Sequence, residues 1–280
     1  MQAARQRTRL SALALGLCLS GATAAASQTV VANVPGSNTV ARSEALELQG
    51  DLLGAAALLE EALASAPSDG QLHWRIARDL LRHAEANPKL DDAERAAFYG
   101  RARDWAHGGR TLAPDCAECC LYEFAGTARL ASVHGLAQAV GTVREAGRLL
   151  HECLANPPRH TDASGSEEAA LYYGASVYFR LMPDSEWMGW ATGQRSDAAR
   201  AVGFARRAVA IEERPRYRLE LGAALLCDGA RRGDKRALAE GRRWLDDAAA
   251  SGAGIDAERA RALRGDTPQR GCTLSHDDPS

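Results

Sequence analysis

The stretch GDLLGAAALLEEALASAP, residues 50–67, carries the pattern that decides the fold. After Gly50, the residues Ala55, Leu59 and Ala62 follow at intervals of four and three, so their side chains share one face of a helix. Pro67 then ends the helix, because proline cannot donate the backbone hydrogen bond and disfavours helix in the residue before it. Small residues on that face let a second helix approach closely. The stretch therefore predicts one helix of a tightly packed pair.

The same spacing returns along the chain, which is the mark of a repeat. Three later copies place small or apolar residues at these intervals: Ala102, Ala106, Gly109 and Pro114; Ala146, Leu150 and Cys153; and Ala201, Ala205 and Ala208. An amphipathic segment precedes each copy, as in LHWRIARDLLRHA at 72–84. One helix pair cannot bury its apolar face, but stacked pairs can. We therefore predict an all-α fold, an α-solenoid of about five antiparallel helix hairpins over residues 39–264, with a short C-terminal capping helix at 256–264.

The repeat resembles the tetratricopeptide repeat (TPR), most closely at residues 50–67. The order of LHWRIARDLLRHAE, AHGGRTLAPDCAECCLYEFAGTARL, EEAALYYGASVYFRLMPDSEW and ARAVGFARRAVAIE resembles a narrower group, the exported T-component proteins of TRAP-type transporters and the related regulator-of-microtubule-dynamics repeats. The resemblance covers about residues 40–250. It implies a TPR-like fold and an accessory role beside a solute-binding protein. The chain departs from that group in lacking a good lipid-attachment motif.

The two ends of the chain predict export and disorder. Residues 1–26 combine arginines, a short apolar run and small residues, which indicates a secretory signal peptide cut after Ala26. We favour cleavage over a lipid anchor at Cys18, because the large Leu17 precedes that cysteine. We expect a flexible linker at 27–38, a disordered tail at 265–280, and a location in the periplasm or cell envelope.

The net charge of the chain and the motifs that it lacks exclude several classes of function. Removing residues 1–26 removes three arginines and no acid, so the mature chain is acidic and does not predict nucleic-acid binding. No later segment is apolar enough to span a membrane. The seven histidines form no metal-binding spacing, and no catalytic serine, cysteine or phosphate-loop motif occurs. We therefore expect no enzyme activity, no metal and no cofactor, and a homo-oligomer is compatible with the pattern.

The cluster PDCAECC, residues 114–120, leaves several interpretations open. Cys116, Cys119 and Cys120 lie where a new helix is expected to begin, and a helix N-terminus lowers the pKa of a thiol. Inert cysteines and a structural disulfide are the main alternatives, with redox or metal chemistry as a third. At most one of Cys119 and Cys120 is expected to face the core. Cys153 is expected as a buried free thiol, and Cys272 as an exposed one.

Five aromatic residues form the candidate binding site. Tyr172, Tyr173 and Tyr178 lie on one expected helix, and Trp187 and Trp190 follow it in a loop. Aromatics are only 5% of the chain, so this density predicts either a ligand pocket or the filling of an irregular repeat junction.

The function expected from these features is binding without catalysis. A helical-repeat scaffold that docks a partner protein or peptide in the cell envelope is the first expectation. A transporter accessory that handles a small solute is the second, and it requires an apolar cavity near residues 172–190. A thiol-active protein using Cys116 and Cys119 is the third.

Overall fold

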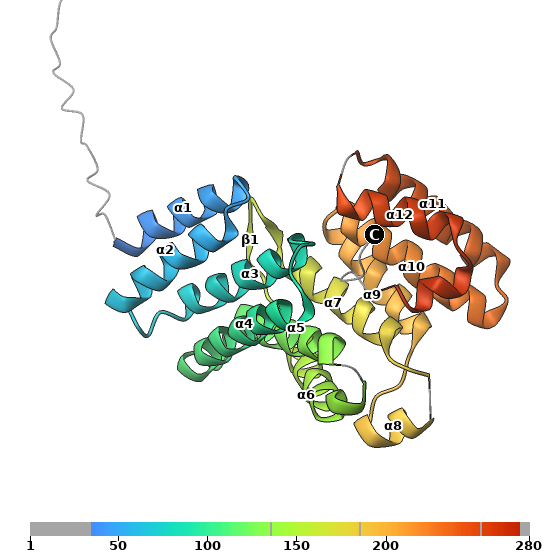
Figure 1. Ribbon diagram of the computed structural model, residues 1–280, viewed down its shortest axis with the longest axis horizontal. Coiled ribbons are helices and arrows are strands. Elements are labelled where there is room, and N and C mark those ends of the chain that lie inside the picture. Colours follow the sequence, from blue (N-terminus) through green and yellow to red (C-terminus); the bar gives the residue numbers. More distant parts are fainter. Residues whose placement is uncertain (1–34, 135, 185, 253, 275–280) are drawn as a thin grey trace, which may run out of the picture. The chain divides into compact units, whose positions relative to one another are not determined.

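The helices of this protein succeed one another in packed pairs (Figure 1). The computed structural model describes residues 35–134, 136–184, 186–252 and 254–274. Five hairpins pair α1 with α2, α3 with α4, α5 with α6, α7 with α9, and α10 with α11, and α12 packs on the last pair. The bounds are α1 Pro35–Leu48, α2 Leu52–Ser65, α3 Gly70–Ala86, α4 Asp92–Leu112, α5 Ala117–His134, α6 Leu136–Ala155, α7 Glu167–Leu181, α8 Glu186–Thr192, α9 Ala198–Ile211, α10 Pro215–Arg232, α11 Lys235–Ala250 and α12 Ile255–Gly265. The predicted all-α solenoid of five hairpins with a C-terminal cap is confirmed.

Aspartate side chains begin many of these helices. An aspartate at the N-cap accepts a hydrogen bond from a backbone N–H of the first turn, which would otherwise lack a partner. The helices α2, α3, α4, α9 and α11 begin this way, at Asp51, Asp69, Asp91, Asp197 and Asp234. At α4 the cap is reciprocal, because Glu94 also accepts from the backbone of Asp91. Local sequence therefore sets where each pair starts.

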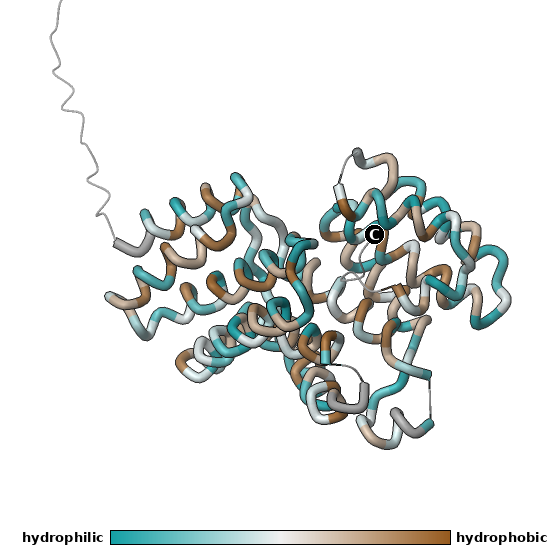
Figure 2. Tube along the Cα trace, viewed as in Figure 1, coloured by the Kyte–Doolittle hydropathy of each residue, from teal (hydrophilic) through white to brown (hydrophobic). Residues whose placement is uncertain are grey.

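The repeated small residues lie where the helices of a pair meet. The positions Ala55, Leu59, Ala102, Ala106, Gly109, Ala146, Leu150, Cys153, Ala201, Ala205 and Ala208 are all buried, while Ala62 is partly buried. Pro67 and Pro114 each lie two residues beyond a helix end, and Gly50 takes a φ of 82° in the turn before α2. Figure 2 shows apolar and polar residues interspersed along the helices, the pattern of amphipathic packing.

The core has one large and one small part. The large cluster runs from α2 to α11 and includes Trp74, Tyr99 and Phe124. The small cluster joins α10, α11 and α12 to Leu274, beyond the last helix. In the part of the chain that the structure describes, no helix has the length and hydropathy needed to cross a membrane.

Three segments differ from the sequence expectation. Helix α1 starts at Pro35, so the end of the expected linker at 27–38 is helical. The link between α6 and α7 contains a small antiparallel hairpin, β1 Thr161–Asp162 and β2 Gly165–Ser166, although no strand was expected. Residues 268–272 form a 3₁₀ helix, η1, that packs on α10, so the expected disorder from 265 is wrong as far as residue 274. The signal peptide, the rest of the linker and residues 275–280 lie outside the described residues.

Gly109 marks a close helix approach that a substitution can test. A Cβ atom there would lie 2.7 Å from Cys119 Sγ and 2.9 Å from His73 Cβ. We expect Gly109→Ala to lower the free energy of unfolding by ~1–3 kcal/mol through overpacking. Gly100→Ala in the same helix is the matched control, since nothing lies within 4 Å of its added Cβ and alanine favours helix. Urea unfolding of both variants measures the difference, and equal midpoints would contradict the close approach.

Candidate binding site

The three predicted tyrosines are buried on α7 but belong to two surroundings. Tyr172 faces α9, where its ring stacks on Phe204 at 6.1 Å and its hydroxyl accepts a hydrogen bond from Arg207 at 2.7 Å. Tyr173 and Tyr178 instead line a pocket between α5 and α7. The pocket therefore includes two of the three tyrosines, and Tyr172 serves the packing of α7 on α9.

The two predicted tryptophans belong to a different helix from the pocket tyrosines. They lie on α8, a short helix between α7 and α9 that packs against α6. Trp190 is 85% exposed and does not line the pocket. The side chain of Trp187 lies outside the described residues. Of the predicted aromatic residues, Tyr173 and Tyr178 therefore line the pocket, Tyr172 packs against α9, and Trp190 lies exposed on a separate helix.

The pocket, which we call the α5–α7 pocket, has a volume of about 250 Å³. Half-buried small residues line it at helical spacing: Ala125 and Ala128 on α5, and Gly174 and Val177 on α7. Apolar and aromatic residues complete most of the wall, namely Leu81, Leu121, Tyr122, Phe124, Ala131, Val143, Ala170, Leu181, Met182, Pro183 and Tyr217. Because small side chains stand on both helices, space remains between them that apolar atoms can fill.

The pocket tyrosines are fixed in place and uncharged. The Tyr178 hydroxyl donates to the carbonyl oxygen of Val143 at 3.0 Å. The ring of Tyr173 lies 5.5 Å from that of Tyr217. Burial raises the pKa of both Tyr173 and Tyr178, because a phenolate would lose its hydration there. Tyr173 and Tyr178 therefore offer an aromatic surface to a ligand, and neither acts as a base.

One wall of the pocket is ionic. Arg129 on α5 donates to Glu85 Oε1 through Nε at 3.0 Å and through a terminal nitrogen at 2.6 Å. Arg216 on α10 donates to Glu85 Oε2 at 3.1 Å. Burial alone would raise the pKa of Glu85, but the two guanidiniums outweigh it and lower that pKa to about 2. Glu85 is thus a fixed anion that joins the first helices of the second, third and fifth hairpins.

A second, more open pocket adjoins the first. It has a volume of about 450 Å³ and is lined by the α1–α2 turn, the β1–β2 hairpin, α12 and parts of α3 and α10. The two pockets share Arg82, Glu85, Arg214 and Arg216 in their walls. We call these four residues the junction. An apolar space and a polar space therefore meet at a group rich in guanidiniums.

The link between α6 and α7 covers the first helices of the first two hairpins. Its Asp162 accepts from Arg78 at 2.7 Å, and its Ser164 donates to Glu47 on α1 at 2.6 Å. Its His160 ring lies 4.9 Å from that of Trp74. The guanidinium of Arg78 lies 5.0 Å from the same Trp74 ring. This face is therefore occupied by the chain itself.

The C-terminal segment covers α7 and α10 in a similar way. Arg180 and Glu220 form a fully buried pair with nitrogen and oxygen 2.7 Å apart. Arg180 also donates to the carbonyl oxygens of Gly271 and Leu274, at 2.8 and 2.9 Å. A disulfide from Cys227 to Cys272 holds the same segment. The α5–α7 pocket thus lies between two covered regions.

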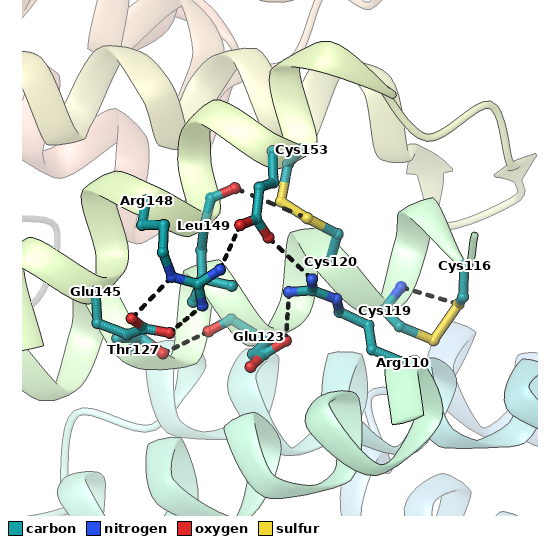
Figure 3. The surroundings of a disulfide bond; sticks show 11 residues. Arg110, Cys116, Cys119, Cys120, Glu123, Thr127, Glu145, Arg148, Leu149 and Cys153 are labelled. Carbon is teal, nitrogen blue, oxygen red and sulfur yellow. Dashed lines mark hydrogen bonds and ion pairs between the residues drawn. A yellow bond between two sulfur atoms is a disulfide. The ribbon is translucent and has the colours of Figure 1, made fainter. Parts of the chain in front are cut away.

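The six cysteines beyond residue 26 form three disulfides. Cys116 bonds to Cys119, Cys120 to Cys153, and Cys227 to Cys272. Figure 3 shows the first two beside Arg110, Glu123, Glu145 and Arg148. Arg110 donates to Glu123 at 2.8 Å and to Glu152 at 2.9 Å. The first bond joins the residue before α5 to the first turn of that helix, and the second joins α5 to α6. The cysteines of residues 114–120 therefore form structural disulfides at the start of a helix.

Three cysteine expectations are wrong. Cys153 is not a free thiol and Cys272 is not an exposed one, since both are disulfide-bonded. Cys119 and Cys120 are both buried, although at most one was expected to be. Consecutive residues can both be buried here because Cys119 faces α4 at Gly109 while Cys120 reaches α6. No described cysteine is free to act as a thiolate, and no described cluster of His, Cys, Asp and Glu fits a metal ion.

Comparison with known proteins identifies a solved structure of similar fold. No known family profile matches the chain, and no curated protein matches it. Among solved structures, a thermophilic TPR protein of Thermus thermophilus superposes with a TM-score of 0.54 at 16% identity, over 81% of this chain and 96% of that one. The fold is a TPR-like helical repeat. At this identity the likeness shows the fold alone, so the narrower T-component resemblance stays a hypothesis.

The TPR-like repeat also contains site residues that sequence reasoning missed. Ala170, Gly174, Val177 and Leu181 recur at intervals of four, three and four on α7. That stripe of small and aliphatic residues is visible in the sequence, and Tyr173 and Tyr178 lie beside it in the wall of the same pocket. The ionic wall was not visible, because Glu85, Arg129 and Arg216 come from three hairpins.

Proposed function

We propose that this chain is an exported, non-enzymatic helical-repeat protein that docks a partner protein or peptide in the cell envelope. In this proposal an apolar side chain of the partner enters the α5–α7 pocket. Stacked helical repeats bind partners on an extended concave face. In this chain the first helices of neighbouring hairpins pack side by side, α3 on α5, α5 on α7 and α7 on α10, and form one such face. Here the link before α7 covers part of that face and the C-terminal segment covers another part. The pocket between them carries the proposal, because it is apolar, preformed and open to a side chain.

Export is supported by two features of the chain. The first 26 residues have the composition of a secretory signal peptide. Three disulfides join all six later cysteines, which is typical of proteins in oxidising compartments.

Peptide-library selection on the full chain tests the docking proposal. We expect enriched peptides to carry an aromatic or large aliphatic residue, and Ala128→Trp, which fills the pocket, to weaken their binding at least tenfold. Ala57→Trp adds the same indole on the exposed side of α2 and is the matched control. Circular dichroism confirms that both variants are folded. No enriched peptide, or peptides that bind Ala128→Trp normally, would contradict the proposal.

A second candidate is the transporter accessory that handles a small solute, and the α5–α7 pocket is an apolar cavity of the kind that this role requires near residues 172–190. Native mass spectrometry of the exported protein tests this alternative. A small molecule that copurifies with the wild type and Ala57→Trp, but not with Ala128→Trp, would support it. Empty protein in all three samples would argue against it.

A further inference from the structure

The junction between the two pockets consists of three partly exposed arginines and one largely buried glutamate. The side chains of Arg82, Arg214 and Arg216 are 23%, 34% and 31% exposed, respectively. The side chain of Glu85 is only 10% exposed. Each guanidinium offers five N–H donors, and a carboxylate takes one or two of them. The three arginines line both pockets and therefore keep donors there that these carboxylates do not use.

Two of the acids that meet these arginines are shared with other arginines. Glu85 accepts from both Arg129 and Arg216, so one carboxylate serves two guanidiniums. Glu47 accepts from Arg82 at 3.3 Å, but it accepts from the buried Arg78 at 2.6 Å. Two of the three arginines thus depend on a carboxylate that another arginine also uses. An incoming acid would gain charge-assisted hydrogen bonds here without displacing a buried pair.

Arg214, the third arginine, pairs with an acid close to it in the sequence. Its Nε donates to Glu212 Oε1 at 2.6 Å, and that partner lies two residues away in the turn before α10. The Arg214 side chain reaches the backbone of the β1–β2 hairpin, since a Cβ on Gly165 would lie 2.4 Å from its terminal nitrogen. It therefore stands between the hairpin and α10, at the edge where the apolar and polar pockets meet.

We propose that the partner segment carries an acidic side chain next to the apolar side chain that enters the α5–α7 pocket, and that this acid binds at Arg82, Arg214 and Arg216. The inference rests on the proposed function and adds the partner's chemistry to it. The occupant is an extended peptide of another protein, because the apolar and cationic parts form adjoining spaces along the same wall. Charge complementarity selects an acidic peptide over a basic one.

The same peptide-library selection tests this inference separately from docking itself. We expect enriched peptides to place Asp or Glu within about three residues of the apolar anchor. For such a peptide, the double variant Arg82→Gln with Arg214→Gln should weaken binding about tenfold, and it should flatten the dependence of affinity on salt. For an analogue peptide in which the acid is replaced by Asn or Gln, the double variant and the wild-type protein should bind with the same affinity. Arg101→Gln, an exposed arginine paired with Glu60 outside both pockets, is the control.

The possible results separate the two proposals. Enriched peptides with an apolar anchor but no neighbouring acid would overturn the acidic partner and leave docking intact. Acidic peptides whose affinity is unchanged in the double variant would also overturn it, because the acid would then bind elsewhere. Failure to enrich any peptide that depends on the pocket would overturn the docking proposal, and the inference with it.

Discussion

Replacing Arg78 with methionine should lower the free energy of unfolding by about 3–5 kcal/mol at pH 7, the usual cost of leaving buried partners of one charge uncompensated. The side chain of Arg78 is fully buried. It donates to Glu47 at 2.6 Å, to Asp162 at 2.7 Å and to Glu167 at 3.1 Å. Methionine fills a similar volume, so the loss reports the charge and not a cavity.

The pH dependence of this loss distinguishes its origin. Burial would raise the pKa of Asp162, but Arg78 outweighs it and lowers that pKa to about 2. A lowered pKa contributes stability above the ordinary value near 3.8, and that stability is lost as the pH falls toward 2. The variant lacks this contribution, so its deficit should shrink on acidification from pH 7 to pH 3. Urea unfolding at several pH values measures it.

Arg101→Met provides the matched comparison. Arg101 pairs with Glu60 at 3.0 Å, but its side chain is 52% exposed. A surface pair of this kind contributes between zero and about 1 kcal/mol. Equal losses in the two variants would mean that the Arg78 cluster is hydrated and does not join α1, α3 and the link before α7.

The helix pairs could be read from the sequence because their determinants are local. Ala102, Ala106 and Gly109 stand at helical intervals, and Asp91 with Glu94 marks a helix start. These signals act within one or two turns, so they survive without knowledge of the rest of the chain. The same holds for Pro67 and Pro114, which stop a helix wherever they occur.

The site was harder to predict because its members are distant in sequence. Glu85 and Arg216 are 131 residues apart, and Ser164 reaches Glu47 across 117 residues. No periodicity relates such pairs, and pairing of charges across hairpins depends on how the hairpins stack. The ordered segment after residue 265 was missed for the same reason, since its order depends on Arg180 and on the disulfide from Cys227.

Replacing Asp79 should raise the free energy of unfolding, whereas replacing Arg78 should lower it. The side chain of Asp79 is fully buried, and neither carboxyl oxygen has a hydrogen-bond partner among the described residues. The nearest guanidinium atom, Arg78 Nε, is 3.9 Å away, too far for a hydrogen bond. Burial, followed by repulsion from Glu47, outweighs the nearby arginines and raises the pKa of Asp79 to about 8.

A raised pKa means that the folded protein holds a proton that the unfolded chain has released. The stability linked to Asp79 is therefore complete below about pH 3.8 and is lost progressively as the pH rises to about 8. Glu85 acts in the other direction, since its pKa is lowered to about 2 and its contribution is lost only as the pH falls below its ordinary value of 4.5. Together these groups predict greatest stability at mildly acidic pH.

Asp79→Asn should accordingly stabilise the protein by ~2–4 kcal/mol at pH 7, because the neutral amide removes the cost of protonation, about 1.4 kcal/mol for each pH unit above the unfolded pKa. The gain should nearly vanish at pH 4, where the unfolded chain also carries much of that proton. Urea unfolding at pH 4 and pH 7 measures it, with the exposed Asp104→Asn as control. A variant that is less stable than the wild type at both pH values would contradict the raised pKa and would show that Asp79 is an ionised partner of Arg78.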